Sequence, residues 1–342
     1  MSRACHAARV MARELARGGT IVVLGEALID LLVDVDGSTH ALPGGGPFNA
    51  ARTIARLGGD VVFLGQLSDD RFGQLLRTRL LADGVRLGLP DPCTAPTTLA
   101  VAELDAGGAA RYQFYTAGTS AAALDVAQAT AAWPSEVVAI HIGTLGLVLE
   151  PVATTIAGLL AAIRPDAPPP DAMSSSPLVF CDPNCRPAVI VDDAAYRLRL
   201  SRILAATDVV KVSGDDLAYL SPGVELLAAA TELLDAGPSV VLFTDGAEAV
   251  RVLTAEGDDC ILVPQVDVVD TVGAGDAFGA AFLTWWIDGG RRREHLSDRT
   301  ALRAAALHAT EVASKTVQRA GADPPLRSEL TWCGGPGDLE GT

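Results

Sequence analysis

The chain has 342 residues, of which 49% are hydrophobic, and its 26 Lys and Arg against 42 Asp and Glu leave a formal net charge of −16. This length and apolar content are typical of one α/β domain around a single core, whereas the negative charge disfavours nucleic acid and anionic membranes as partners. Because Lys211 and Lys315 are the only lysines, a bound phosphate must be held by backbone N–H groups, single arginines or a metal.

The six cysteines indicate a reducing compartment, because they form no CxxC pair and are too sparse for a secreted disulfide scaffold. Residues 1–19 lack the continuous apolar core of a signal peptide, so we interpret them as an N-terminal extension. No apolar stretch reaches the ~18 residues that a membrane helix needs. We therefore expect a cytoplasmic protein that does not insert into a membrane.

Short β-branched runs alternate with helical patterns along most of the chain. Buried strands are expected at 20–25, 61–65, 137–143, 178–182, 208–212 and 239–243. Apolar residues recur at spacings of three and four, as in amphipathic helices, at 48–58, 194–206 and 224–237. The alternation of strand and helix predicts an α/β fold, with a doubly wound, mostly parallel sheet flanked by helices.

Two segments near the N-terminal end carry polar residues that could bind a substrate. GEALID at 25–30 places Asp30 at the far end of the first strand, where an unpaired carboxylate is costly unless it binds hydroxyl groups. LPGGGPFNAARTIARLGG at 42–59 joins a Gly-rich loop to a helix, with Asn49 near the helix start. Its glycines are either a hinge or an ordinary tight turn.

One segment departs from the strand–helix rhythm. Residues 97–118 predict two strands around a Gly-containing turn, with Arg111 on one face and Phe114 on the other. A hairpin inserted in a doubly wound domain is a decoration or a lid. The Pro/Ser-rich segment 164–177 predicts a solvated loop, and the Gly-rich residues 331–342 predict a flexible tail.

The segment VVDTVGAGDAF at 268–278 places small residues directly before an acid and an apolar run. The apolar pattern predicts a helix that begins near Ala274 or Gly275, and the free N–H groups of its first turn predict an anion pocket. Asp276 is then either the base that takes a proton from an attacking hydroxyl during phosphoryl transfer or a favourable charge in the first turn of a helix. The motif alone does not separate these interpretations.

Other phosphate-binding motifs do not fit the sequence. Neither lysine follows a glycine, which excludes a Walker A loop, and no HRD or DFG signature of protein kinases is present. Gly273, Gly275 and Gly279 have the wrong spacing for a dinucleotide fingerprint, which disfavours a nicotinamide enzyme.

Four motifs, GEALIDLL, PGGGPFNAA, DPNCRP and VVDTVGAGDAF, in this order resemble those of the ribokinase-like (PfkB-type) carbohydrate kinases, and most closely the bacterial fructokinases. The resemblance runs from about residue 20 to about 325. It implies a ribokinase-like kinase domain over 20–330. It also implies a small β lid, formed from about 36–46 and 97–118 and hinged at Gly44 and Gly45.

The resemblance implies roles for single residues. Asp276 would be the catalytic base, and the backbone of Gly273, Ala274 and Gly275 would form the anion hole. Sugar hydroxyls would be held by Asp30, Gly45, Gly46, Asn49, Arg111, Asn184 and Arg186. Asp270 corresponds to a position near a monovalent-cation site, which makes K⁺ a candidate ion.

The chain departs from the family pattern in the nucleotide region. The usual Asn-x-x-Glu or Ser-x-x-Glu is here Ser213-Gly-Asp-Asp216. The side chain of Asp216 is one methylene shorter than that of the usual Glu, which shortens its reach toward metal-bound water. The resemblance assigns metal contacts to Asp216 and Asp270. It assigns nucleotide contacts to Ser213, Thr244, Gly246, Thr271, Gly273, Gly275 and Thr310. Thr310 stands where asparagine is common, and the Thr244–Gly246 segment can also be a plain turn.

The resemblance therefore implies an ATP- and Mg²⁺-dependent kinase for a sugar hydroxyl, with fructose as the first candidate. A carboxylate substrate should need more than one positive group, and only Arg111 accompanies Arg186, which favours a neutral sugar. The alternatives are a 2-keto-3-deoxygluconate kinase, a ribokinase, a non-catalytic sugar or nucleotide sensor on the same fold, and an oxidoreductase. A homodimer through the lid is the candidate assembly.

Overall fold

The computed structural model describes residues 19–104, 110–164 and 176–331. Most of the expected N-terminal extension, the turn of the 97–118 hairpin, the 164–177 loop and the tail lie outside the described residues. In the described part of the chain, no helix is both long and apolar enough to cross a membrane.

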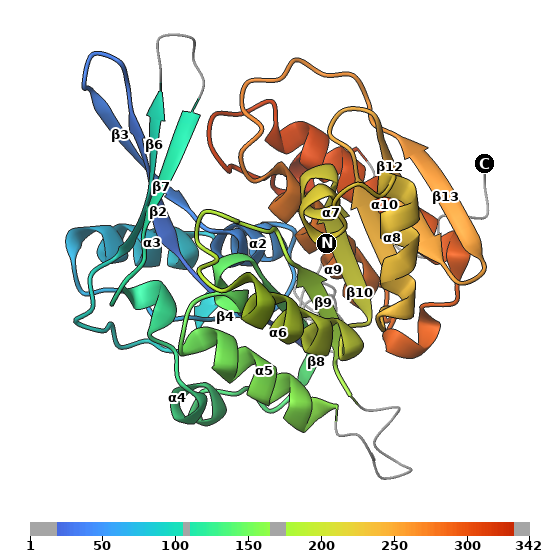
Figure 1. Cartoon of the computed structure of the whole chain (residues 1–342), viewed down its shortest axis with the longest axis horizontal. Helices are drawn as coiled ribbons and strands as arrows, with labels where there is room; N and C mark the ends of the chain where they lie inside the picture. The colour runs from blue at the N-terminus through green and yellow to red at the C-terminus, as the bar shows by residue number, and fades with distance from the viewer. Residues whose placement is uncertain (1–18, 105–109, 165–175, 332–342) are drawn as a thin grey trace, which may run out of the picture.

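A nine-stranded sheet forms the centre of the molecule, in the order β13-β12-β11-β10-β9-β8-β1-β4-β5 (Figure 1). Every neighbouring pair is parallel except β11–β12 and β12–β13, which are antiparallel. The strands are β1 (Thr20–Leu24), β4 (Val61–Leu64), β5 (Arg86–Leu87), β8 (Val137–Gly143), β9 (Leu178–Asp182), β10 (Val209–Ser213), β11 (Val240–Thr244), β12 (Ala249–Thr254) and β13 (Gly257–Leu262). The predicted strands and the doubly wound α/β class are confirmed, whereas the β12–β13 hairpin was not predicted.

Helices cover both faces of this sheet and form two separate cores. Packed on one face are α2 (Gly46–Arg56), α3 (Arg71–Ala82), α9 (Ala274–Asp288) and α10 (Arg299–Thr316). Packed on the other are α4 (Val126–Ala131), α5 (Val152–Ile163), α6 (Asp193–Ala205), α7 (Gly214–Leu220) and α8 (Leu226–Asp235). Alternate residues of β1 enter different cores, Ile21 and Val23 one and Val22 and Leu24 the other. This explains why the strands are continuously apolar.

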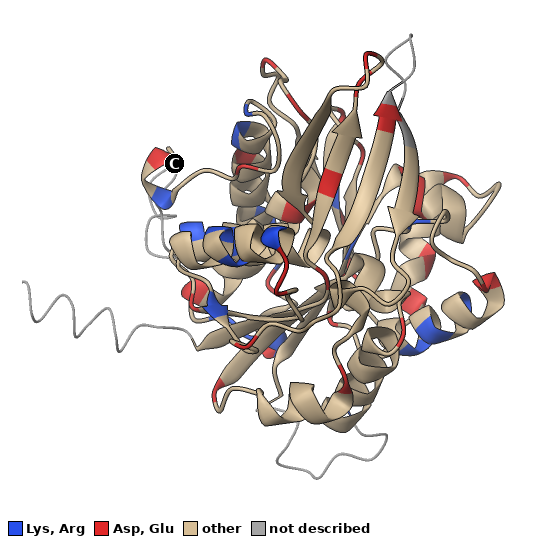
Figure 2. Cartoon of the chain, turned by 90° about the vertical axis from the view of Figure 1, so that its left-hand side faces the viewer, with Lys and Arg blue, Asp and Glu red and all other residues tan. Residues whose placement is uncertain are grey.

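A second sheet of four strands stands beside the main one, in the order β3-β2-β6-β7 (Figures 1 and 2). Its strands are β2 (Leu28–Val33), β3 (Thr39–Gly44), β6 (Thr98–Leu104) and β7 (Ala110–Tyr115). β6 and β7 pair antiparallel, as the pattern of 97–118 predicts. A small cluster of Leu28, Ala100, Leu145 and Val189 joins the base of this sheet to the main body. β2 and β3 were not predicted from the sequence. β3 carries Pro43, which is tolerated because β3 is an edge strand.

The placement of Asp30 at the end of the first strand is wrong. That strand, β1, ends at Leu24, and Asp30 lies inside β2 of the second sheet. The chain leaves the main sheet at Gly25, whose φ of 141° only glycine adopts easily. A Cβ at Gly25 would also lie 2.5 Å from Cγ of Pro47. The chain therefore turns away from the main sheet at Gly25, and Asp30 lies in the second sheet.

Candidate active site

The carboxyl ends of β8, β9 and β10 meet the first turn of α9, and strained backbone marks this region. Thr144, just after β8, has φ 51°, and Asn184, just after β9, has φ 39°. They are the positive-φ residues other than glycine in the described chain. Such conformations cost of order 1–3 kcal/mol and persist where the surrounding structure enforces them, often at functional sites. Ligands also bind at this edge of open α/β sheets.

The first turn of α9 follows a glycine and has no side-chain cap. Its N-cap is Gly273 with φ 76°, and no side chain caps the helix. The Ala277 N–H donates to the Gly273 carbonyl oxygen at 2.8 Å, so the N–H groups of Gly275 and Asp276 precede the first donor of the helical ladder. A Cβ at Gly273 would lie 2.5 Å from Cβ of Ala322, so glycine is required for packing as well as for φ. The helix begins at Ala274, as the sequence predicts.

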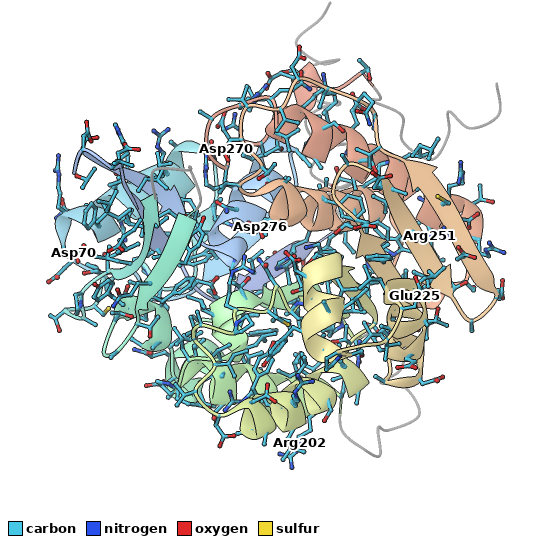
Figure 3. All side chains as sticks on the ribbon, turned by 45° about the horizontal axis from the view of Figure 1, so that its top comes forward. Asp70, Arg202, Glu225, Arg251, Asp270 and Asp276 are labelled. Atoms are coloured by element: carbon cyan, nitrogen blue, oxygen red, sulfur yellow. The ribbon has the colours of Figure 1, made fainter. Side chains whose placement is uncertain are left out.

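Asp276 faces the first turn of α2 across the strand ends. The Nδ2 group of Asn49 donates to Oδ2 of Asp276 at 2.8 Å, although the two residues are 227 positions apart. A Cβ at Gly46 would lie 2.4 Å from Oγ1 of Thr144 and 3.2 Å from Oδ1 of Asp276. Figure 3 shows Asp276 near the centre of the molecule, between elements from both ends of the chain. The two glycine-rich motifs therefore meet around one carboxylate.

Asp30 approaches the same region from the second sheet. Burial, and after it the charge of Asp276, raises the pKa of Asp30 to about 6, while the positive charge of Arg186 acts in the opposite direction. A Cβ at Gly44 would lie 2.0 Å from Oδ2 of Asp30, so the glycine lets this carboxylate pack against the neighbouring strand. The side chain of Arg186 donates to the carbonyl oxygens of Asn184 and Cys185, at 3.4 and 3.1 Å.

Glu26 is a functional candidate that the sequence analysis missed. It is fully buried, and its two carboxyl oxygens accept from the N–H groups of Gly46 at 3.2 Å and Gly146 at 3.1 Å. It therefore connects the start of α2 to the loop after β8, the two segments that meet at Asp276. Burial raises the pKa of Glu26 to about 8. The available signal was a glutamate directly after an apolar strand, where a charge is costly.

The raised pKa of Glu26 predicts that wild-type stability falls with rising pH. Between the unfolded pKa of 4.5 and the folded pKa of about 8, the folded state binds more protons at this site than the unfolded state, so the free energy of unfolding decreases. In urea titrations from pH 5 to 8, wild type should lose stability relative to Glu26→Gln, with a slope that approaches about 1.4 kcal/mol per pH unit. Parallel curves for the two proteins would contradict the assignment.

Asp216 is held by protein donors. Its Oδ1 accepts from the Cys185 N–H at 2.6 Å, and its Oδ2 accepts from the Ser213 N–H at 2.8 Å and the Ser213 hydroxyl at 2.7 Å. This reciprocal capping box begins α7. Among the described residues, no cluster of three or more His, Cys, Asp or Glu forms a metal site. A contact of Asp216 with a hydrated metal stays a prediction.

Asp270 connects two loops, since its Oδ1 accepts from Val272 N–H at 3.0 Å and its Oδ2 from Gly321 N–H at 2.8 Å. Its role near a cation stays a prediction. Thr271 is exposed beside it. Asp270 and Thr271 thus lie on the chain segment that leads into the first turn of α9.

The other expected nucleotide residues are less tightly grouped. Gly246, with φ 55°, has open space around it, and the Thr244 hydroxyl donates to the Val212 carbonyl oxygen at 3.4 Å. Thr310 is buried and donates to the Ala306 carbonyl oxygen at 2.8 Å within α10. Arg111 lies in β7 opposite Glu103, with its side chain outside the described part of the molecule. The roles of these four residues stay predictions.

A sequence model of the family described as pfkB family carbohydrate kinase matches residues 19–329. The chain belongs to this family. The kinase is 33% identical to a fructokinase of Rhizobium leguminosarum bv. trifolii over 77% of this chain and 78% of the relative. It is 32% identical to an Escherichia coli fructokinase over 77% of this chain and 82% of that protein.

Two solved structures are similar to the kinase over nearly its whole length. A fructokinase from Xylella fastidiosa with bound ATP has a TM-score of 0.77 at 26% identity and covers 91% of this chain and 96% of its own. An aminoimidazole riboside kinase from Salmonella enterica, complexed with aminoimidazole riboside and an ATP analogue, has a TM-score of 0.75 at 25% identity. That match covers 89% of this chain and 95% of the other. The kinase therefore shares the ribokinase-like fold.

Proposed function

We propose that this carbohydrate kinase transfers the γ-phosphoryl group of ATP to a hydroxyl of fructose. The observation that carries the proposal is the position of Asp276, which lies in the uncapped first turn of α9 and is held by Asn49 at 2.8 Å. If the only task of Asp276 were to bind ATP, its carboxylate would be poorly placed there, because it would repel a phosphate group. It is well placed if it receives the proton of the attacking hydroxyl.

Each residue of the site then has a chemical task. Asn49 orients the Asp276 carboxylate, and the N–H groups of Gly275 and Asp276 stabilise the charge on the transferring phosphoryl oxygens. Phosphoryl transfer has a loose transition state, so the placement of the carboxylate beside the attacking hydroxyl is its main contribution. Asp30 and Asn184 are proposed to hold sugar hydroxyls, together with the backbone at Gly45 and Gly46.

The residues present fit a hydrated Mg²⁺ that arrives with ATP. Mg²⁺ keeps several waters and needs few protein ligands, which agrees with the absence of a carboxylate cluster among the described residues. Mg²⁺ would neutralise charge on the ATP phosphates. Asp216 would orient its water from the start of α7, and Asp270 is the proposed neighbour of a K⁺ ion.

The second sheet is proposed to act as a lid over the sugar. It is joined to α2 through Gly44 and Gly45, and closure would exclude water, which would otherwise accept the phosphoryl group. Its exposed side chains include Leu42, Tyr112 and Tyr115. Tyr115 faces the opposite side of this sheet from Leu42 and Tyr112, and the homodimer through the lid stays a prediction.

The charges around the sugar site favour a neutral substrate. Asp30 and Asp276 lie close enough for the charge of Asp276 to raise the pKa of Asp30. A substrate carboxylate would meet these charges, and Arg186, the arginine of the site whose side chain is described, already bonds to two backbone carbonyl oxygens. Fructose presents hydroxyls alone, and carboxylates accept hydrogen bonds from hydroxyls without repulsion.

The Arg186→Ala variant separates the neutral sugar from the acid. We expect KM for fructose to rise by less than about tenfold, because a hydroxyl loses at most a modest hydrogen bond. Steady-state ADP release measures this, with the exposed Arg202→Ala of α6 as the matched control. The assignment of fructose would be wrong if the wild-type enzyme preferred 2-keto-3-deoxygluconate and the variant lost several kcal/mol of binding free energy for that acid. A loss of this size is expected when a buried carboxylate is left unpaired.

A substrate screen tests the function as a whole. ADP release should be fastest with fructose when compared with 2-keto-3-deoxygluconate, ribose, tagatose 6-phosphate, adenosine and aminoimidazole riboside. The last substrate enters because of the similarity to the riboside kinase. Sugar binding by calorimetry without turnover of any substrate would favour the sensor instead.

A further inference from the structure

A buried ion pair lies directly beneath the first turn of α9 and has no role in the scheme above. Nζ of Lys211 lies 3.1 Å from Oδ2 and 3.3 Å from Oδ1 of Asp182. The side chains are 5% and 3% exposed. Lys211 is in β10 and Asp182 ends the neighbouring strand β9, with the two strands parallel. The pair therefore lies at the carboxyl edge of the main sheet, where the site is.

The ammonium group packs against the first turn of α9 itself. A Cβ at Gly275 would lie 2.8 Å from Nζ and 3.5 Å from Cε of Lys211. The end of the Lys211 side chain thus occupies the space that a side chain at position 275 would need. The positive charge lies under the residue whose N–H group points out of the first turn of α9.

Charged groups approach Lys211 from several neighbouring elements. Asp182 belongs to β9, Asp216 to α7 and Asp276 to α9, and buried His141 lies on β8. Burial opposes the charge of Lys211, but the three carboxylates outweigh it and raise its pKa. Burial also raises the pKa of Asp182 to about 6, with Lys211 acting in the opposite direction. Both partners are therefore ionised at pH 7.5. Burial lowers the pKa of His141 to about 3, so it stays neutral.

Fold stability alone does not call for such a pair. A buried ion pair can often be replaced by apolar residues of similar volume without loss of stability, and the rest of β10 is apolar apart from its last residue. The chain has one other lysine, Lys315, near the end of α10. Among the described residues, Asp182 is the only hydrogen-bond partner of the buried Lys211 ammonium group. The position of Lys211 is therefore better explained by the electrostatic effect of its charge on its surroundings than by fold stability.

We propose that Lys211, held by Asp182, is a positioning residue that places a fixed positive charge beneath the Gly273–Gly275 turn and stabilises the phosphoryl group there during transfer. The inference rests on the proposed role of this turn. The charge is pre-organised because the pair is buried and fixed, so it needs no reorganisation when negative charge accumulates on the phosphoryl oxygens.

Two variants that lack the Lys211 charge test the proposal. Lys211→Met combined with Asp182→Leu removes both charges and leaves none unpaired, while Lys211→Gln keeps a donor for Asp182 without the charge. We expect the double variant to unfold within a few degrees of wild type, because the replacement is apolar and of similar volume. In both variants kcat should fall at least about tenfold, while KM for the sugar changes less than about threefold. Lys315→Met, the matched control, should keep wild-type kcat.

The outcomes separate this inference from the proposed function. The assays use whichever sugar the wild type phosphorylates fastest, so an incorrect choice of fructose leaves the test valid. A folded variant that lacks the Lys211 charge and has a kcat within about threefold of wild type overturns the inference, even if Asp276→Asn is slow. Failure of both variants to fold also overturns it, because the pair is then structural. Normal turnover by Asp276→Asn would instead refute the proposed site.

Discussion

Replacing Asp276 with Asn should lower kcat by roughly 10² or more, the scale of a lost general base. The fold should survive, because the new amide oxygen can still accept the hydrogen bond that Asn49 donates to Oδ2 at 2.8 Å. Nucleotide binding should also survive, since the N–H groups of the α9 turn belong to the backbone. Steady-state kinetics gives kcat, and calorimetry with an ATP analogue gives the affinity.

The control for Asp276 is Asp235→Asn, which changes the same group at the exposed end of α8. It should keep wild-type kinetics. A variant of Asp276 that turns over at a near-normal rate would mean that this carboxylate only stabilises the first turn of α9. A variant that loses nucleotide affinity along with kcat would point to misfolding of the turn.

Gly45→Val should raise KM for the sugar and lower kcat together, because it acts on the junction of the second sheet and α2. Gly45 has φ 105°, which valine adopts only with strain. A Cβ there would lie 3.0 Å from the Glu26 carbonyl oxygen, so the backbone must move. Lid variants tend to change both constants, since closure commits the sugar and completes the site.

Gly84→Val separates the local strain from the effect on the lid. Gly84 has φ 89° and no atom within 4 Å of the position of an added Cβ, outside its chain neighbours. It should therefore lose stability through strain while keeping normal kinetics. Unchanged kinetics in Gly45→Val would reduce this glycine to a turn residue, and equal kinetic losses in both variants would show that strain alone causes them.

Asn49 and Asp30 act on Asp276 in opposite ways and come from different parts of the fold. Asn49 comes from a helix packed on the main sheet and donates to Asp276. Asp30 comes from the second sheet and carries a charge that repels it. A sugar hydroxyl between the two carboxylates can donate to one and relieve the repulsion. We therefore expect sugar binding to favour approach of the second sheet.

Local patterns in the sequence were enough for the layered fold and the start of the key helix. The apolar runs predicted six strands, because strands buried on both faces must be apolar throughout. The glycines before Asp276 predicted a helix start, because residues without side chains leave the first N–H groups open, and α9 does begin at Ala274. The family motifs added which carboxylate and which amide belong to one site.

Tertiary structure decided which groups touch. Strand periodicity carries no information on sheet order, so β9 beside β10, and with it the Asp182–Lys211 pair, could not be inferred. Asp30 was placed on the wrong sheet because the exit of the chain depends on the φ of Gly25 and its contact with Pro47. Glu26 resembled part of a strand until its two N–H partners, from segments 20 and 120 residues away, were known. Each of these depends on long-range packing, and the energy of a buried charge is set by its neighbours in space rather than in sequence.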